Sequence, residues 1–366
     1  MSQIRAGRRI SGIQYLRALC AGIVVLSHEN GFLAFPEYFG RAPLPDLHLV
    51  SLFAVAVFFG ISGFIIVISA LDGAWRPRMS TGAFLVRRGV RILPFLWVCT
   101  FVYNGLSAVG THVVDWGAMG RTLVLWPVGA FKPNVVWSLR HEALFYGLFA
   151  VTVLAWPRWR GVGIGWILAP LVFAPLIWDW HVVKPADGAV GYDLFRLVLA
   201  GGESGANLQF GVGIAVGLAH LRGWFDVRRV RLSLWHLVVV FVIGCGLVHF
   251  TDLPSGLARA VVWSVLTGLI LVAACLTWPR AAGSDRVALA LGNGSFSLYL
   301  MHNTVMLIVL AVTMKLHVAL HGEGQLLGYL GFCVLASFAA CQALHYGVEK
   351  PLHRACANRL MPRRHG

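Results

Sequence analysis

Charged side chains are scarce in this sequence. Asp, Glu, Lys and Arg make up 12% of the 366 residues, whereas hydrophobic residues make up 58% and the mean hydropathy is +0.74. A soluble chain of this length needs more polar surface to cover its core. The scarcity of charge therefore excludes a soluble globular protein and predicts a chain embedded in a lipid bilayer.

Sequence patterns for several kinds of chemistry are also missing. No two of the seven cysteines have the spacing of a metal or redox site, and most lie inside apolar segments. We interpret them as small buried residues and expect no metal. A phosphate-binding glycine loop and a Gly-x-Ser-x-Gly nucleophile motif are absent as well. Any catalysis is therefore expected from polar side chains of the membrane segments themselves.

The apolar residues fall into ten stretches, which predict an all-α, polytopic membrane protein with about ten transmembrane helices. The stretches are 12–33, 48–70, 83–107, 135–155, 162–178, 204–221, 233–250, 258–278, 293–314 and 326–347. The first has no small-residue cleavage pattern after it, so we expect a retained helix. Lys350 and Pro351 are expected to end the last helix. No soluble domain is expected, and residues 1–366 are predicted to form a single domain.

The positive charge of the chain has a topological explanation. A formal net charge of +15 invites a nucleic-acid partner, but 21 of the 30 Lys and Arg residues fall on one side of the predicted membrane. Loops rich in Lys and Arg stay in the cytoplasm. We therefore predict a multi-pass protein of the cytoplasmic (inner) membrane with both termini cytoplasmic, and no nucleic-acid partner.

Ionisable residues inside the apolar stretches are the first functional candidates, because a charge in hydrocarbon is costly unless it is paired or faces water. Arg17 and His28 are eleven residues apart, so they share one helix face about 16 Å apart along the axis. Ser138 and Glu142 lie at i and i+4 on another stretch, with Glu142 at a depth similar to that of His28. A hydrogen bond between this imidazole and carboxylate would suit a general base. The alternative is a structural ion pair of Glu142 with Arg140 or with a residue of another helix.

Two further groups complete the candidate set. Arg87, Arg88 and Arg91 lie at the predicted cytoplasmic end of the third stretch, where arginine forks suit phosphate or pyrophosphate, although positive-inside anchoring alone would also explain them. Tyr299 and His302 share one face of the ninth stretch and are expected to point inward, because both would be costly facing lipid. Together these residues predict a phosphate-bearing donor on the cytoplasmic side and an acceptor on the other.

With these residues identified, the chain resembles the acyltransferase-3 family of integral membrane O-acyltransferases nearly from end to end. Six segments carry the resemblance: "IQYLRALCAGIVVLSH" with Arg17 and His28, "FFGISGF", "RRGVRILPFLW" with Arg88 and Arg91, "VVWSLRHEALFY" with Glu142, "GSFSLYLMH" with His302, and "VEKPLHR" with Glu349. One departure concerns the second segment. Family members often have Ser or Thr three or four residues after its Gly-Phe, where this chain has Ile66 and Val67, with Ser69 later.

The resemblance implies transfer of an acyl group, expected to be acetyl, from cytoplasmic acyl-CoA to a hydroxyl of a cell-surface or exported glycan or glycolipid. Arg87, Arg88 and Arg91 are then expected to hold the CoA phosphates. The other expected partners are the lipid bilayer around the chain and further copies of the same chain in a homo-oligomer.

The resemblance also implies roles for the remaining residues. His28 is expected to be the general base or to carry a transient acyl group, with Glu142 orienting it and Arg17 steering the donor or stabilising negative charge near the thioester. Ser138, Tyr299 and His302 are expected to contact the substrate.

Three other classes of function fit parts of the pattern. A transporter or flippase would also use buried ionisable residues. A non-catalytic membrane partner of a polysaccharide assembly system would tolerate loss of His28. A haem-binding bundle fits least, because the histidines inside the stretches do not form two facing pairs.

Overall fold

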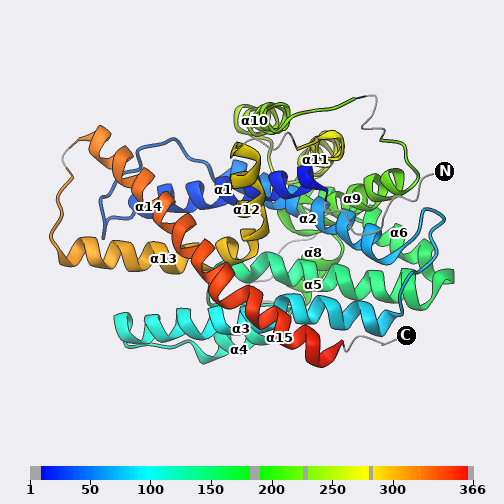
Figure 1. Cartoon of the computed structure of the whole chain (residues 1–366), viewed down its shortest axis with the longest axis horizontal. Helices are drawn as coiled ribbons and strands as arrows, with labels where there is room; N and C mark the ends of the chain where they lie inside the picture. Colours follow the sequence, from blue (N-terminus) through cyan, green and yellow to red (C-terminus); the bar gives the residue numbers. More distant parts are fainter. Residues whose placement is uncertain (1–9, 182–189, 226–229, 280–282, 321, 362–366) are drawn as a thin grey trace.

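The computed structural model describes residues 10–181, 190–225, 230–279, 283–320 and 322–361, and helices joined by loops build these ranges (Figure 1). No β-strand occurs among the described residues; the bridges Leu71–Pro77 and Leu232–Thr277 are isolated. The α-helices are α1 (Ser11–Leu33), α2 (His48–Ala70), α3 (Thr81–Thr111), α4 (Trp116–Val124), α5 (Trp137–Phe149), α6 (Arg160–Leu168), α7 (Pro170–Ala174), α8 (Val190–Val198), α9 (Ala206–Leu221), α10 (Leu234–Thr251), α11 (Leu257–Leu276), α12 (Gly283–Asn293), α13 (Ser295–Lys315), α14 (Glu323–Leu344) and α15 (Lys350–Leu360).

Short 3₁₀ and π turns extend several of these helices. The 3₁₀ turns are η1 (Asn134–Val136), η3 (Pro157–Trp159) and η5 (Gly202–Ser204), and the π turns are η2 (Ala150–Ala155), η4 (Pro175–Asp179) and η6 (His345–Glu349). The turn η1 leads directly into α5, and η2 continues α5 without a break. Such turns let one long segment change its winding without leaving backbone groups unpaired in the bilayer.

Seven described segments are long and apolar enough to cross a membrane by length and composition: His48–Ala70, Thr81–Gly110, Arg160–Asp179, Leu234–Thr251, Leu257–Leu276, Ser295–Lys315 and Glu323–Leu360. All ten predicted stretches are helical, but three fall outside this set. Of these, α1 carries Arg17, His28 and Glu29, and the α-helical parts of the other two, α5 and α9, have 13 and 16 residues. The all-α, multi-pass membrane class is confirmed. The number ten and the cytoplasmic location of the termini stay predictions, and residues 1–9 and 362–366 lie outside the described ranges.

The helix α2 occupies the centre of the molecule because almost every residue in it is apolar. It packs against α1, α9, α10 and α11, and Phe53 and Phe64 are fully buried among them. A helix that is hydrophobic all round has no face for water and belongs in the interior. In Figure 1, α1, α2, α3, α5 and α13 lie in the plane of the view, whereas α10 and α11 are seen nearly end-on and cross them steeply.

Glycines allow α2 and α9 to approach very closely. A Cβ added to Gly63 would lie 2.1 Å from the Phe210 carbonyl oxygen, and one added to Gly213 would lie 1.9 Å from the Gly60 carbonyl oxygen. No side chain fits at either position without moving a backbone. In lipid the hydrophobic effect does not drive helices together. Small residues at such crossings let the helices associate through close van der Waals packing instead.

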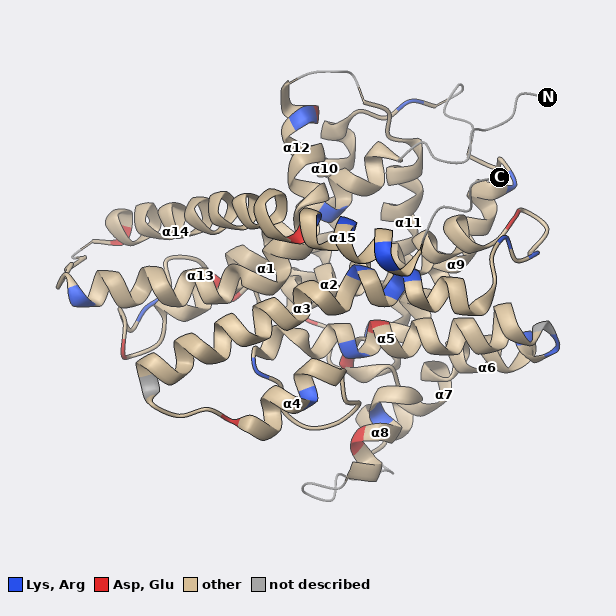
Figure 2. Ribbon diagram, turned by 60° about the horizontal axis from the view of Figure 1, so that its bottom comes forward, with Lys and Arg blue, Asp and Glu red and all other residues tan. Residues whose placement is uncertain are grey.

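The last helix does not end where the sequence suggested. We expected Lys350 and Pro351 to stop it, but α14 passes through the π turn η6 into α15, which begins at Lys350 and runs to Leu360. Pro351 sits in the first turn of α15, where a missing N–H costs little. Figure 2 shows long uncharged stretches of α13 and α14, whereas Lys and Arg gather where α3 and α15 lie side by side.

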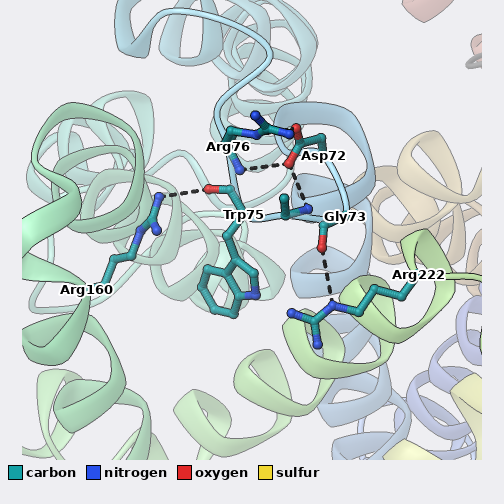
Figure 3. Close-up of polar contacts among 7 residues, drawn as sticks. Asp72, Gly73, Trp75, Arg76, Arg160 and Arg222 are labelled. Atoms are coloured by element: carbon teal, nitrogen blue, oxygen red, sulfur yellow. Dashed lines mark hydrogen bonds and ion pairs between the residues drawn. The ribbon is translucent and has the colours of Figure 1, made fainter.

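The loop between α2 and α3 is held by polar contacts of its own and by arginines at the ends of two other helices, α6 and α9 (Figure 3). The Asp72 carboxylate accepts hydrogen bonds from the backbone N–H groups of Ala74 and Arg76, at 2.8 and 2.9 Å, and the bond from Arg76 is the main cause of a lowered pKa for Asp72. Two distant arginines bind backbone carbonyls of the loop. Arg160 donates to Trp75 at 2.8 Å and Arg222 donates to Gly73 at 3.2 Å. These contacts fix the loop that delivers the chain into α3 and its arginines.

Candidate active site

A cavity lies where α1, α2, α3, α5 and α13 meet, and polar side chains from all five helices line it. They are Arg17, Ser62, Arg88, Arg91, Ser138, Glu142, Tyr146, Ser295 and Tyr299. Six of the nine residues singled out from the sequence are therefore brought together, although they come from four separate parts of the chain. His28, His302 and Arg87 do not line this cavity.

Arg88 is anchored at one end of the cavity. Its Nη2 donates to the Ser69 hydroxyl at 2.7 Å, and its guanidinium lies over the rings of Phe84 and Tyr146, at 5.4 and 5.2 Å from their centroids. Its buried Nε has no hydrogen-bond partner among the described residues. The chain has no hydroxyl at positions 66 and 67, where family members often have one. Ser69 provides a hydroxyl nearby, and this hydroxyl binds an arginine of the site.

The other two arginines of this segment differ in placement. Arg91 is exposed and lines the cavity, so it lies where the cavity meets the surface. Arg87 is exposed and lies outside the cavity lining. Helix spacing alone does not produce this difference, because Arg91 lies about 60° from Arg88 and about 40° from Arg87 around the helix axis. The packing of α3 against its neighbours decides which of the two arginines enters the cavity.

Arg17 is buried with 8% of its surface exposed. Its Nη1 lies 3.4 Å from the Gln14 side-chain oxygen, and its charge interacts with those of Arg91, Glu142 and Glu349. A buried guanidinium requires such carboxylates nearby. Its position beside the cavity, away from the helix end, rules out simple snorkelling to the interface.

Glu142 has partners other than the one we predicted. Its Oε1 accepts from the Ser62 hydroxyl at 2.7 Å and from the Tyr146 hydroxyl. No hydrogen bond joins it to His28, so the predicted His28–Glu142 pair is wrong. The prediction rested on the similar depths of His28 and Glu142 along their helices. Depth does not fix rotation, and α1 is rotated so that the His28 imidazole meets His302 on α13 instead of Glu142 on α5.

His28 is hydrogen-bonded to His302. The His28 Nδ1 lies 2.8 Å from the His302 Nε2, and the two rings are inclined by only 10°. The His302 Nδ1 lies 2.9 Å from the Leu298 carbonyl oxygen, which can only accept. With neutral rings, His302 therefore carries its proton on Nδ1 and accepts from His28 through Nε2. His28 is left with a proton on Nδ1 and a free lone pair on Nε2.

Ser138 and Tyr299 connect the cavity to this histidine pair. The Tyr299 hydroxyl donates to the Val135 carbonyl at 2.7 Å, so the Ser138 hydroxyl, 2.6 Å away, must donate to the tyrosine oxygen. The Tyr299 and His302 rings lie 6.4 Å apart between centroids. Both hydroxyl protons are thus engaged within the protein, which leaves these oxygens as acceptors toward the cavity.

Glu349 is held by two residues, one of which the sequence did not single out. Its Oε2 accepts from the Ser297 hydroxyl at 2.5 Å and lies 2.8 Å from His345 Nδ1. Ser62, which binds Glu142, lies in the segment "FFGISGF" but was not singled out within it either. A serine in such a stretch gives no separate signal, because packing and hydrogen bonding both favour a small side chain there.

Comparison with known proteins identifies the family of the chain. Residues 10–346 match the family model described as an acyltransferase domain, so the chain belongs to the acyltransferase-3 family and is a membrane acyltransferase. It is also similar to the exopolysaccharide production protein ExoZ of Rhizobium meliloti (strain 1021), with 28% identity over 272 residues, which cover 70% of this chain and 76% of that protein. No solved structure matches the chain.

Proposed function

We propose that this acyltransferase transfers an acetyl group from cytoplasmic acyl-CoA to a hydroxyl of a cell-surface or exported glycan or glycolipid, in the cytoplasmic (inner) membrane of a bacterium. One observation carries the proposal. A single cavity is lined by Arg88 and Arg91, with Arg91 exposed, and by Tyr299, whose ring lies 6.4 Å from that of His302 in a histidine pair that leaves a free imidazole lone pair. A donor that carries phosphates and a reactive thioester at opposite ends suits this arrangement.

The donor is bound first through its phosphates. Arg88 and Arg91 present guanidinium groups, which form paired hydrogen bonds to phosphate oxygens. The Ser69 contact and the flanking rings hold the Arg88 guanidinium in place before the donor arrives. The separation of about 16 Å along α1 between Arg17 and His28 favours a role for Arg17 in steering the donor, and not at the reacting carbonyl.

Transfer then uses the lone pair of His28. Its Nε2 takes the proton of the acceptor hydroxyl while that oxygen attacks the thioester carbonyl, and collapse of the tetrahedral intermediate breaks the carbon–sulfur bond. The proton passes from His28 to the departing CoA sulfur, which leaves as the thiol. His302 holds the imidazole in the productive tautomer. In the variant route, Nε2 itself accepts the acyl group before the hydroxyl attacks.

The proposal that the acceptor is a glycan is supported by a relative of the chain. The matched protein of Rhizobium meliloti is described as an exopolysaccharide production protein. Membership of an acyltransferase family also favours the enzyme over the transporter or flippase that buried ionisable residues would otherwise allow.

The test is transfer of label from radioactive acetyl-CoA in membranes that contain wild type or His28→Ala, with and without a crude envelope glycan fraction. We expect label in the glycan for wild type, and a loss of about a hundredfold or more in the variant, since general-base catalysis contributes that much. His317→Ala, at an exposed position beyond α13, is the matched control and should behave as wild type. Equal transfer by His28→Ala would remove His28 from the reaction.

A further inference from the structure

A second cavity lies on the other side of Phe59 from the first. It is bounded by α2, α5, α8, η5 and α11, and its lining includes Arg140, Arg196, Arg259, Asp193, Glu203 and Trp137. Trp137 and Arg140 lie in one of the family segments quoted above, whereas the other four residues belong to none of them. Placing five charged side chains around one cavity of a membrane protein costs free energy unless water fills the cavity or a ligand occupies it.

The polar groups of this cavity are incompletely used within the protein. Among the described residues, none forms a hydrogen bond with the side chain of Arg196, Asp193 or Glu203, and the buried Nε of Arg140 has no partner. Arg259 is different. It is fixed by the Leu253 carbonyl and the Ser255 hydroxyl, so it forms a wall of the cavity.

His141 supplies a buried acceptor that lacks a donor. It is 3% exposed, and its Nδ1 lies 3.3 Å from the Trp137 carbonyl, so the proton belongs on Nδ1. Its Nε2 is therefore a lone pair, and it has no hydrogen-bond partner among the described residues. It faces Gly202, where an added Cβ would lie only 3.2 Å away. A ligand O–H is the group that this atom lacks.

The two cavities share a thin partition. Phe59 lines both, and its ring lies 5.6 Å from that of His141. His48, which lines the second cavity, is close enough to His28 for their charges to interact. A molecule in the second cavity therefore approaches the histidine pair from a direction different from that of a donor held by Arg88 and Arg91.

We propose that the second cavity binds a negatively charged saccharide, which is the part of the acceptor that sets acceptor choice. Three arginines line the cavity against two carboxylates, and Asp252 outside the lining offsets part of the charge of Arg259. Arg196, which has no hydrogen-bond partner among the described residues, is therefore the group left for a sugar carboxylate or phosphate. Asp193 and Glu203 accept from sugar hydroxyls, His141 accepts from another, and the Trp137 indole packs against the ring face. This inference rests on the proposed function, because it assigns the second substrate of the same reaction.

The experiment measures binding of a defined tetrasaccharide to the purified full chain in detergent. The probe carries one glucuronate, and its carboxyl-reduced form is the neutral comparison. A tetrasaccharide with a terminal phosphate in place of the carboxylate distinguishes the two sources of charge. We expect the charged probes to bind wild type about tenfold or more tightly than the neutral one, as one charge-assisted hydrogen bond allows. Arg196→Gln should abolish that preference.

The control is Arg41→Gln, which removes an exposed arginine that lies outside the lining of both cavities and donates a hydrogen bond to the Leu320 carbonyl. It should keep the preference. Equal binding of charged and neutral probes by wild type, or an unchanged preference in Arg196→Gln, would overturn the inference.

Binding of acetyl-CoA is measured on the same preparations to separate the two proposals. Acetyl-CoA binding without any preference for charged sugar defeats this inference alone. A charge preference in wild type that Arg196→Gln removes supports this inference even if acetyl-CoA fails to bind, and only the proposed donor is then defeated.

Discussion

The two paired histidines are the central feature at the scale of residues. A catalytic imidazole is usually oriented by a carboxylate or a carbonyl, whereas here a second neutral imidazole, itself bonded to a backbone carbonyl, accepts from His28 Nδ1. This arrangement fixes the tautomer of His28 without placing a negative charge beside it. Glu142 is thereby free to bind Ser62 and Tyr146 within the first cavity, which is the one proposed to bind the donor and is called the donor cavity below.

His302→Phe tests that assignment. The ring volume is kept, but the acceptor for His28 is lost, so we expect kcat to fall about tenfold, which corresponds to one hydrogen bond. The KM for acetyl-CoA should stay unchanged, because His302 lies outside the donor cavity. Steady-state kinetics on purified protein provide both values. A raised KM with unchanged kcat would mean that His302 contributes to donor binding instead.

Neighbouring arginines provide a matched comparison for the donor site. Arg88→Ala removes a guanidinium held over two aromatic rings in the cavity, and Arg87→Ala removes an exposed one outside it. We expect Arg88→Ala to raise the Kd for acetyl-CoA about ten- to a hundredfold, since it loses charge-assisted bonds to phosphate. Arg87→Ala should change it less than about threefold. Equal effects would indicate that general positive charge, and not the cavity, attracts the donor.

At the scale of elements, the contact between α2 and α9 decides how the donor cavity is built. Backbone-to-backbone approach at Gly63 and Gly213 leaves no room for a side chain. The same helix α2 then carries Ser62 and Phe59 to the two cavities. Movement at this crossing therefore shifts both cavity walls together.

Gly213→Ala is expected to destabilise the protein. The new methyl group would overlap the Gly60 carbonyl, and overpacking of this kind costs about 1–3 kcal/mol. Gly246→Ala on α10, where nothing lies within 4 Å of the added atom, is the control and should be neutral or slightly stabilising. Thermal unfolding in detergent measures both. Similar apparent Tm values for the two variants would show that α2 and α9 separate easily.

At the scale of the whole molecule, the sidedness of the chain is the open structural prediction. The helices establish a multi-pass protein, but length and composition do not orient it. Orientation is argued from the concentration of 21 of 30 Lys and Arg residues on one predicted side. This orientation also places the arginine end of the donor cavity in the cytoplasm, where acyl-CoA is found.

A fusion at the C-terminus checks this orientation. Green fluorescent protein folds in the cytoplasm, and we expect it to fluoresce when joined after residue 366. Alkaline phosphatase at the same point should stay inactive. The reverse pattern would place the C-terminus outside and would require an odd number of membrane crossings if the N-terminus is cytoplasmic.

The sequence by itself determined the class of protein and most of the site's members. Hydropathy is a local property, so the helical stretches could be located without knowledge of their neighbours, and helix periodicity placed Arg17 and His28 on one shared face. Arg88 and Arg91 were identified through the family segment that contains them. The motifs then identified the family, which the family match confirmed.

The tertiary structure alone decided the partners. His28 and His302 are 274 residues apart, and Ser62 and Glu142 are 80 apart. Polar groups on different helices can lie at the same depth in the membrane without touching, because contact also depends on how each helix is rotated and tilted. Rotation and tilt are set by close packing, such as the glycine contacts of α2 with α9. The second cavity arises for the same reason, because its charged residues lie on helices that no local pattern relates to one another.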